Sequence, residues 1–491
     1  MSLDPRTPVL VGAAQRSQKP ADPADALEAV ALMQQMVEAA ATDAGSIDLL
    51  RKLDLIAVVY GAWTYSDPGR LIADELGASG ARTSLSYHGG NTPQSYVNAI
   101  SRRIAAGELE VAVITGAETI WSRRRQRAAG LPSPSTRQEG VEPDERFSKD
   151  VQMSSEFEAS RGYQMPVHFY PTFESALRAS RGETIDEHRD RISRLWERFN
   201  EVAAANPHAW RRDRLTAEQI RTADGGNRMV GFPYTKAMNS NWDLDQAAAL
   251  LLCSAGAAEA AGIARDRWVF PLAGTDAHDT LLVSHRRDLH SSPAIGINGR
   301  RLFELSGLGV DDVAHVDLYS CFPSAVQVAA AELGLSEDRQ LTVTGGLTFA
   351  GGPLNNYVTH SIATMAGVLR DDPGTVGLCS ANGGYLTKHA LGLYGTEPAT
   401  NGFQWASCQD EVDRIPATPV AEDHSGPVEV EAYTVMHGQD GPEVALFALR
   451  TAEGARTFGN SDDPELMQAV MVEEAIGRSA QLSGDGRVEL V

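Results

Sequence analysis

The chain has 491 residues, 42% hydrophobic and 22% charged, which excludes a disordered or collagen-like chain and suffices for about three structural units. Its 65 acidic residues outnumber 43 lysines and arginines, and the resulting charge of −22 disfavours binding to nucleic acid or to an anionic membrane face. Four cysteines without a CxxC pair exclude a disulfide scaffold, disfavour a zinc site and lead us to expect no metal. Residues 1–20 lack a basic-then-apolar leader pattern and no apolar run approaches roughly 18 residues, so we expect a cytoplasmic protein that does not enter membranes.

Residues 1–121 alternate apolar strand-like runs with helical stretches. The runs are continuously apolar, as in strands buried on both faces of a sheet. Strands are predicted at 9–15, 56–63, 83–90 and 111–119, and helices at about 24–44, 69–76 and 92–106. This order predicts a parallel-type sheet with helices on its faces.

Residues 122–245 have a different character, because they are charged, rich in arginine and without strand–helix alternation. We interpret them as an inserted helical and loop domain. Four arginines, Arg123, Arg124, Arg125 and Arg127, open this segment. They form either a solvated helix face or an anchor for an anionic ligand.

Residues 246–413 resume the alternating pattern and echo the first part of the chain. Strands are predicted at 268–276, 313–321, 341–346 and 375–384, and helices near 296–306, 324–333 and 356–369. GGNTPQSYVNAI (89–100) and GGPLNNYVTHSI (351–362) each precede a helix and an apolar strand, which indicates an internal duplication.

The last segment, 414–491, begins with the Pro-rich run 415–427, interpreted as a linker. Alternating residues then predict a small antiparallel β unit, followed by a helix at 464–474 and a terminal strand. Residues 415–491 include 14 acidic and 4 basic side chains, so this unit is itself acidic.

Several segments, in the correct order, resemble the sequence blocks of the thiolase superfamily. They are IAAGELEVAVITGAET (104–119), PYTKAMNSNWDLDQAAALLLCSAGAA (233–258), VDLYSCFPSA (316–325), GGLTFAGGP (345–353) and GLCSANGG (377–384). The tail, with EAYTVMHGQDGP (431–442) and an RTxxGxRxxxN pattern (450–460), resembles the additional C-terminal domain of thiolase-like protein type 1. The resemblance implies an α/β fold, the duplicated five-layered βαβαβαββ thiolase fold with an inserted loop domain, plus a small OB-like C-terminal β domain.

A thiolase needs a cysteine thiolate at a helix N-terminus, a histidine that takes its proton, a second cysteine, and donors for the thioester oxyanion. By resemblance the nucleophile's place falls at Gly90, and no cysteine precedes Cys253. The Gly-His-Pro signature reads Gly-Gly-Pro at 351–353, and Tyr319 stands where the middle signature has His or Asn. Only the last block keeps its cysteine, Cys379, so we expect no acyl transfer through a cysteine thioester.

The polar side chains left on the strand-end loops are the candidates for chemistry, because such loops of a duplicated α/β sheet face one cleft. The candidate catalytic residues are Tyr319, Cys379, His88, His389 and Tyr357. The candidate ligand-binding residues are Asn91, Arg123, Asn355, Asn356 and Asn382. Each also has a structural interpretation: a capping histidine, a small buried cysteine, a packed tyrosine with a bonded hydroxyl, or an asparagine in a tight turn.

Three functions stay open. The resemblance implies an acetyl-CoA acetyltransferase or acyltransferase relative that binds coenzyme A or an acyl-CoA between the first half and the insert, as a monomer or homodimer. The first alternative is a retro-aldol lyase for a 3-hydroxyacyl-CoA using Tyr319 and Tyr357, because this chain resembles thiolase-like aldol lyases that have tyrosines in these places and work with an OB-fold partner. The second is a non-enzymatic CoA-binding or scaffold protein, in which the acidic OB-like tail is a poor match for nucleic acid.

Overall fold

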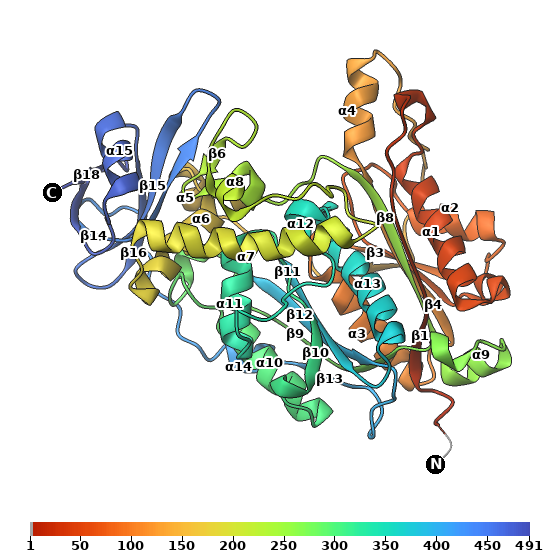
Figure 1. The fold of residues 1–491 in the computed structure, drawn as a ribbon. Helices are drawn as coiled ribbons and strands as arrows, with labels where there is room; N and C mark the ends of the chain where they lie inside the picture. The colour runs from red at the N-terminus through yellow and green to blue at the C-terminus, as the bar shows by residue number, and fades with distance from the viewer. Residues whose placement is uncertain (1–2) are drawn as a thin grey trace.

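The computed structural model describes residues 3–491, and three sheets organise this part of the chain (Figure 1). The first sheet has the order β1 (Pro8–Ser17), β8 (Asp245–Ser254), β4 (Val111–Thr119), β2 (Leu55–Val58), β3 (Arg82–Ser86) and β5 (Glu145–Phe147). The second has the order β10 (Val313–Asp317), β11 (Val376–Gly383), β12 (Lys388–Gly395), β9 (Phe270–His278) and β13 (Gln404–Ser407). The third sheet belongs mainly to the C-terminal segment.

The first two sheets and their helices form five layers, as the resemblance to the thiolase superfamily implied. The helices α3 (Thr92–Ala105) and α13 (Tyr357–Asp371) lie between the sheets, since both contact β8 on one side and β11 on the other. The outer layers are α1 (Ala29–Ala44) with α2 (Pro68–Leu76), and α10 (Pro293–Ser306) with α11 (Pro323–Leu333). The predicted parallel pairing is found between β2 and its neighbours β3 and β4, whereas β8 runs antiparallel to both β1 and β4.

The strand predicted at 341–346 does not form, because this segment wraps around a buried carboxylate. Asp317 is fully buried, and its Oδ1 accepts hydrogen bonds from the hydroxyl of Thr342 (2.7 Å) and the N–H of Val343 (2.9 Å). Gly345 and Gly346 follow with φ of 99° and 76°, conformations that glycine adopts without steric cost, and turn the chain into α12 (Gly346–Phe349). The alternating Leu-Thr-Val-Thr run therefore wrongly predicts a strand at a point where polar contacts decide the local structure.

The insert between β4 and β8 is mostly helical, with three short strands that the sequence did not indicate. Its helices are α4 (Ile120–Ala128), α5 (Glu156–Ser160), α6 (Pro166–Arg181), α7 (Ile185–Ala205) and α8 (Ala217–Arg221). Of its strands, β5 extends the first sheet beside β3, β6 (Met229–Gly231) joins the third sheet beside β14, and β7 (Tyr234–Thr235) pairs with β6.

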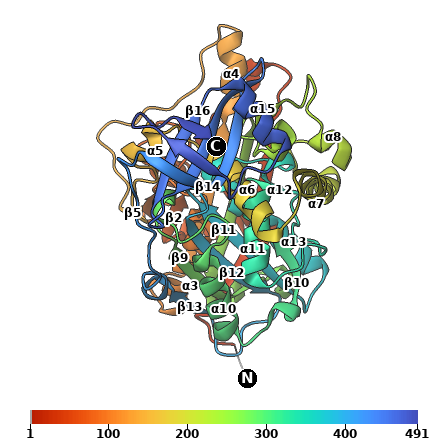
Figure 2. The ribbon, with the colours of Figure 1, turned by 90° about the vertical axis from the view of Figure 1, so that its left-hand side faces the viewer.

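The C-terminal segment forms the antiparallel β unit that the alternating sequence predicted. It consists of β14 (Gly426–His437), β15 (Pro442–Arg450), β16 (Arg456–Ser461), α15 (Pro464–Val472), β17 (Ser479–Leu482) and β18 (Val488–Leu490). Figure 2 faces this unit and shows it next to α6 of the insert, which contacts β14. Phe447 and Leu449 of β15 are fully buried in the apolar core of this unit, to which Ile185 and Phe232 of the insert also contribute.

One buried arginine joins the C-terminal unit to the second half. Arg456 has no exposed surface, and its guanidinium donates to both carboxylate oxygens of Glu431 (2.7 and 2.6 Å). A further nitrogen donates to the backbone oxygens of Ser284 (3.0 Å) and Arg286 (2.5 Å).

Between residues 3 and 491, no helix combines the length and apolar character needed to cross a membrane.

Candidate functional site

Loops of the two halves meet at the N-terminus of α3, where the resemblance places the nucleophile. The N–H of Gly89 donates to Oδ1 of Asn355 (3.0 Å), and Nζ of Lys388 donates to the carbonyl of His88 (2.5 Å). Pro93 stands in the first turn of α3, a position that suits proline, and Asn91 precedes it. The supporting frame of a thiolase site is therefore present.

The place of the nucleophile is filled by another side chain. A Cβ atom added to Gly90 would lie closer than 3.0 Å to the hydroxyl oxygen of Tyr319 and to the carbonyl oxygen of Asn382. Tyr319 follows β10, and its backbone N–H donates to Oγ of Ser380 (2.8 Å), which fixes the residue next to β11. Hence the Tyr319 hydroxyl occupies the space into which a side chain at position 90 would extend.

The place of the proton-accepting histidine is filled in the same way. A Cβ atom on Gly352 would lie closer than 3.0 Å to the hydroxyl oxygen of Ser240, and the N–H of Gly352 donates to the carbonyl of Asn241 (2.8 Å). Both glycines thus coincide with a hydroxyl supplied by a distant part of the chain. Ser240 was not among the candidates from the sequence, because nothing in its local pattern shows that its loop covers position 352.

One small cavity is lined by three of the predicted residues, which are Tyr319, Asn382 and His389. Two of them, Tyr319 and Asn382, are also the residues next to Gly90. Nδ2 of Asn382 donates to the hydroxyl of Tyr170 (2.9 Å), whereas its Oδ1 is buried without a hydrogen-bond partner. Nε2 of His389 lies 3.2 Å from Oγ of Ser292. Tyr170 is a further site residue that the sequence did not indicate, because its contact with Asn382 joins the insert to a strand of the second half.

Besides Oδ1 of Asn382, the Tyr319 hydroxyl is a group in this cavity with free hydrogen-bonding capacity. No side-chain hydrogen bond of Tyr319 is found within residues 3–491. Burial raises the pKa of Tyr319, and the nearby Cys321 raises it further, so the phenol stays protonated and acts as a donor. Burial lowers the pKa of His88 and the charge of Lys388 adds to the effect, which favours a neutral imidazole that can accept a proton.

Other candidates have their hydrogen bonds satisfied within the core. The hydroxyl of Tyr357 contacts Thr344 Oγ1 (2.6 Å) and Asp317 Oδ2 (3.0 Å), and its ring stands edge-on to that of Tyr319 at a centroid distance of 5.4 Å. Cys379 has no exposed surface, and burial raises the pKa of its thiol. Nδ2 of Asn356 donates to the carbonyl of Gly116 (2.7 Å). We therefore interpret Tyr357, Cys379 and Asn356 as structural residues of the core.

The remaining candidates lie at the mouth of the site or away from it. Nδ2 of Asn355 donates to the carbonyl of Tyr60 (2.9 Å) and lies 3.4 Å from Nδ1 of His88, while Oδ1 of Asn91 is buried without a partner. Arg123 lies on α4 near Glu118, a buried carboxyl at the end of β4. The structure therefore brings His88, Asn91 and Asn355 to the N-terminus of α3, next to Tyr319 and Asn382.

Comparisons with known proteins agree with this fold. Residues 407–487 match the family described as thiolase-like protein type 1 additional C-terminal domain. The crystal structure of a monomeric SCP2-thiolase like protein type 1 from Mycobacterium smegmatis is similar over 100% of both chains, with 29% identity and a TM-score of 0.86. The dimeric peroxisomal thiolase of Saccharomyces cerevisiae is similar over 81% of this chain and 99% of its own, with 14% identity and a TM-score of 0.55.

A third similar structure is that of the Ltp2-ChsH2(DUF35) aldolase, with 20% identity, a TM-score of 0.60, and coverage of 80% of this chain and 98% of that one. No curated protein matches the sequence. The two duplicated sheets, the central helices and the site at α3 define a thiolase-like protein. Residues 407–487 match the additional C-terminal domain of thiolase-like protein type 1, and over its full length the chain is similar to a protein of that type.

Proposed function

We propose that the protein binds an acyl-CoA thioester at the N-terminus of α3 without forming a cysteine-linked acyl enzyme. The observation that carries this proposal is the Tyr319 hydroxyl in the space of the missing nucleophile. A protonated phenol at that point can donate to a thioester carbonyl oxygen, but it is too weak a nucleophile to take the acyl group. Lys388 and Asn91 add polar groups beside Gly89.

Calorimetry with coenzyme A and acetyl-CoA, combined with intact mass measurement, tests this proposal. We expect saturable heat and no added acetyl mass. Tyr319→Phe should weaken acyl-CoA binding by about tenfold, since one hydrogen bond is worth roughly 0.5–1.5 kcal/mol. Tyr163→Phe is the matched control, because this buried tyrosine has only a 3.5 Å contact with Thr172. Absence of heat and of thermal stabilisation at millimolar ligand would refute acyl-CoA binding.

A second candidate function, retro-aldol cleavage of a 3-hydroxyacyl-CoA, is favoured by Tyr319 and His389 lining one cavity. His389 would take the proton of the 3-hydroxyl, the bond between C2 and C3 would break to release a carbonyl compound, and Tyr319 would protonate the enolate at C2. Proton transfer from the imidazolium back to the phenolate restores both groups. Tyr357 would orient the ring of Tyr319, and the similarity to the Ltp2-ChsH2(DUF35) aldolase supports this reaction class.

The lyase proposal has its own test. Tyr319→Phe should abolish release of the carbonyl product while a 3-hydroxyacyl-CoA still binds. Unchanged turnover in this variant would refute the acid role of Tyr319.

We propose that the protein is a monomer, as the similar protein from Mycobacterium smegmatis is. The structural reason is that β5 covers the edge of β3 in the first sheet. Light scattering measures the oligomeric state and tests this proposal.

A further inference from the structure

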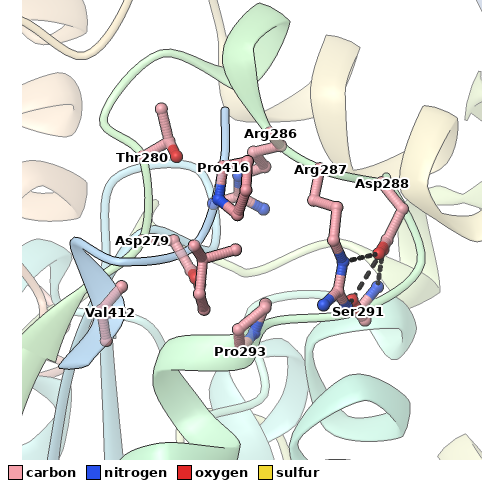
Figure 3. Close-up of a pocket in the computed structure, with 10 residues that line it drawn as sticks. Asp279, Thr280, Arg286, Arg287, Asp288, Ser291, Pro293, Val412 and Pro416 are labelled. Atoms are coloured by element: carbon pink, nitrogen blue, oxygen red, sulfur yellow. Dashed lines mark hydrogen bonds and ion pairs between the residues drawn. The ribbon is translucent and has the colours of Figure 1, made fainter. Parts of the chain in front are cut away.

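A separate pocket lies where the chain leaves the second half for the C-terminal unit. It is a hollow of about 340 Å³, counted together with the solvent at its opening. One wall is the loop between β9 and α10, and the other is α14 (Gln409–Val412) with the linker at 415–416. Figure 3 shows Arg286 and Thr280 on the upper side of this hollow, with Pro293 and Val412 below.

The acidic groups of the pocket already have their hydrogen bonds. Oδ1 of Asp279 accepts from the N–H of Ala294 (3.1 Å), and its Oδ2 accepts from the hydroxyl of Ser292. Oδ1 of Asp288 accepts from the N–H (2.8 Å) and the hydroxyl (2.7 Å) of Ser291, and its Oδ2 accepts from Nε of Arg287 (2.9 Å), as the dashed lines in Figure 3 mark. These carboxylates therefore have little remaining capacity for a ligand.

The donors of the pocket, in contrast, are not all used. Arg286 is 4% exposed, and its Nη2 donates to the carbonyl of Tyr385 (2.8 Å), to the carbonyl of Leu386 and to the hydroxyl of Thr387 (3.2 Å). Its Nε is buried and has no hydrogen-bond partner. A buried cationic donor left without a partner costs free energy, which an acceptor at that point would recover.

We propose that this pocket binds a small oxyanion, the carboxylate or phosphate group of a ligand. Guanidinium groups match the planar carboxylate and the phosphate group by paired hydrogen bonds. Arg286 is the buried anchor, while Arg287 and the hydroxyl of Thr280 stand at the pocket wall. The carboxylates of Asp279 and Asp288 already accept hydrogen bonds, whereas Nε of Arg286 has no acceptor. The pocket therefore lacks a hydrogen-bond acceptor, which an anion would supply and a cation would not.

The oxyanion pocket and the cavity of Tyr319 share a wall. Arg286 holds the carbonyl of Leu386, and Leu386 lines the cavity of Tyr319. Leu386 has φ of 56°, a conformation uncommon for a residue with a side chain, so its position depends on such contacts. Asp279 of the pocket also lies 3.5 Å from His389 of that cavity. Binding in the pocket should therefore order the segment 385–389, whether or not the protein binds an acyl-CoA.

The test is a titration of the whole protein with inorganic phosphate and, separately, with acetate, each against sodium chloride of equal ionic strength. We expect saturable thermal stabilisation with at least one of the two anions, and slower hydrogen exchange at 279–295 and 385–389. Stabilisation by phosphate alone or by acetate alone identifies which source of the oxyanion the site prefers. A response no larger than that to sodium chloride, or protection only elsewhere in the chain, would overturn the proposal.

Two variants locate the site. Arg287→Gln should raise the dissociation constant of the anion about tenfold, which is about 1.4 kcal/mol, because it removes a charged donor from the pocket wall. Arg286→Lys keeps the charge but removes the Nε donor, and it should weaken binding more if the variant folds. Arg51→Gln is the control, because Arg51 is exposed on a 3-10 helix (Ile47–Lys52) of the first half. Equal weakening in Arg51→Gln and Arg287→Gln would show a general charge effect and refute the site.

Discussion

Substituting cysteine for Gly90 tests whether the Tyr319 hydroxyl occupies the space of a side chain at that position. Gly90 does not have the positive φ that would disfavour a side chain, so the cost of Gly90→Cys comes from contacts alone. Its Cβ would meet the Tyr319 hydroxyl and the Asn382 carbonyl at less than 3.0 Å. The carbonyl belongs to β11, where Asn382 pairs with His389 of β12, and it cannot move without disturbing that ladder.

Overpacking a core costs about 1–3 kcal/mol, and we expect the upper end of this range because one of the two obstacles is backbone. The free energy of unfolding, measured by urea denaturation, should fall by roughly 3 kcal/mol in Gly90→Cys. Gly80→Cys adds the same side chain where no atom lies within 4 Å of the new Cβ, so it should leave the stability nearly unchanged. Incubation with acetyl-CoA should add no acetyl group to Gly90→Cys, as measured by intact mass.

A double-mutant cycle separates the two obstacles. In a Tyr319→Ala background, Gly90→Cys should cost less, because the phenol is gone while the Asn382 carbonyl remains. An unchanged cost in that background would contradict the role of Tyr319 as the filling group. If Gly90→Cys were as stable as Gly80→Cys and became acetylated, the whole account of the site would be refuted.

Three further predictions concern buried polar groups. Burial raises the pKa of Glu118 to about 7 from 4.5, so the folded state keeps a proton that the unfolded chain loses, and stability falls as pH rises from about 4.5 to 7. Across that window the wild type should lose roughly 3 kcal/mol relative to Glu118→Gln in urea denaturation, and parallel pH profiles would contradict this. Asp317→Asn should cost about 2–3 kcal/mol in the same assay, because a charged acceptor of several hydrogen bonds is lost, and a cost below about 1 kcal/mol would argue against it. Arg456→Met removes the fully buried partner of Glu431 and leaves it only the partly exposed Arg450, so it should cost about 3 kcal/mol and speed proteolysis of the linker, whereas Arg450→Met should have a smaller effect.

The sequence, through its resemblance to the thiolases, determined the layered fold, and its composition determined that the residues of the thiolase nucleophile and of its histidine are missing. Continuous apolar strands, amphipathic helices and the repeated Gly-Gly motifs are local signals, and they led to the two sheets and the central helices α3 and α13. The absence of any cysteine before Cys253 and the glycine at 352 are facts of composition. Neither depends on how the chain folds.

Only the tertiary structure decided what replaces the missing groups and which candidates are free. That Tyr319 fills the space at Gly90, and Ser240 the space at Gly352, follows from contacts between segments more than 100 residues apart. Tyr319 and Tyr357 look equivalent as residues in a sequence, but Asp317 binds the hydroxyl of Tyr357 alone. Hydrogen bonding and excluded volume act between neighbours in space, and the order of residues along the chain does not record which neighbours those are.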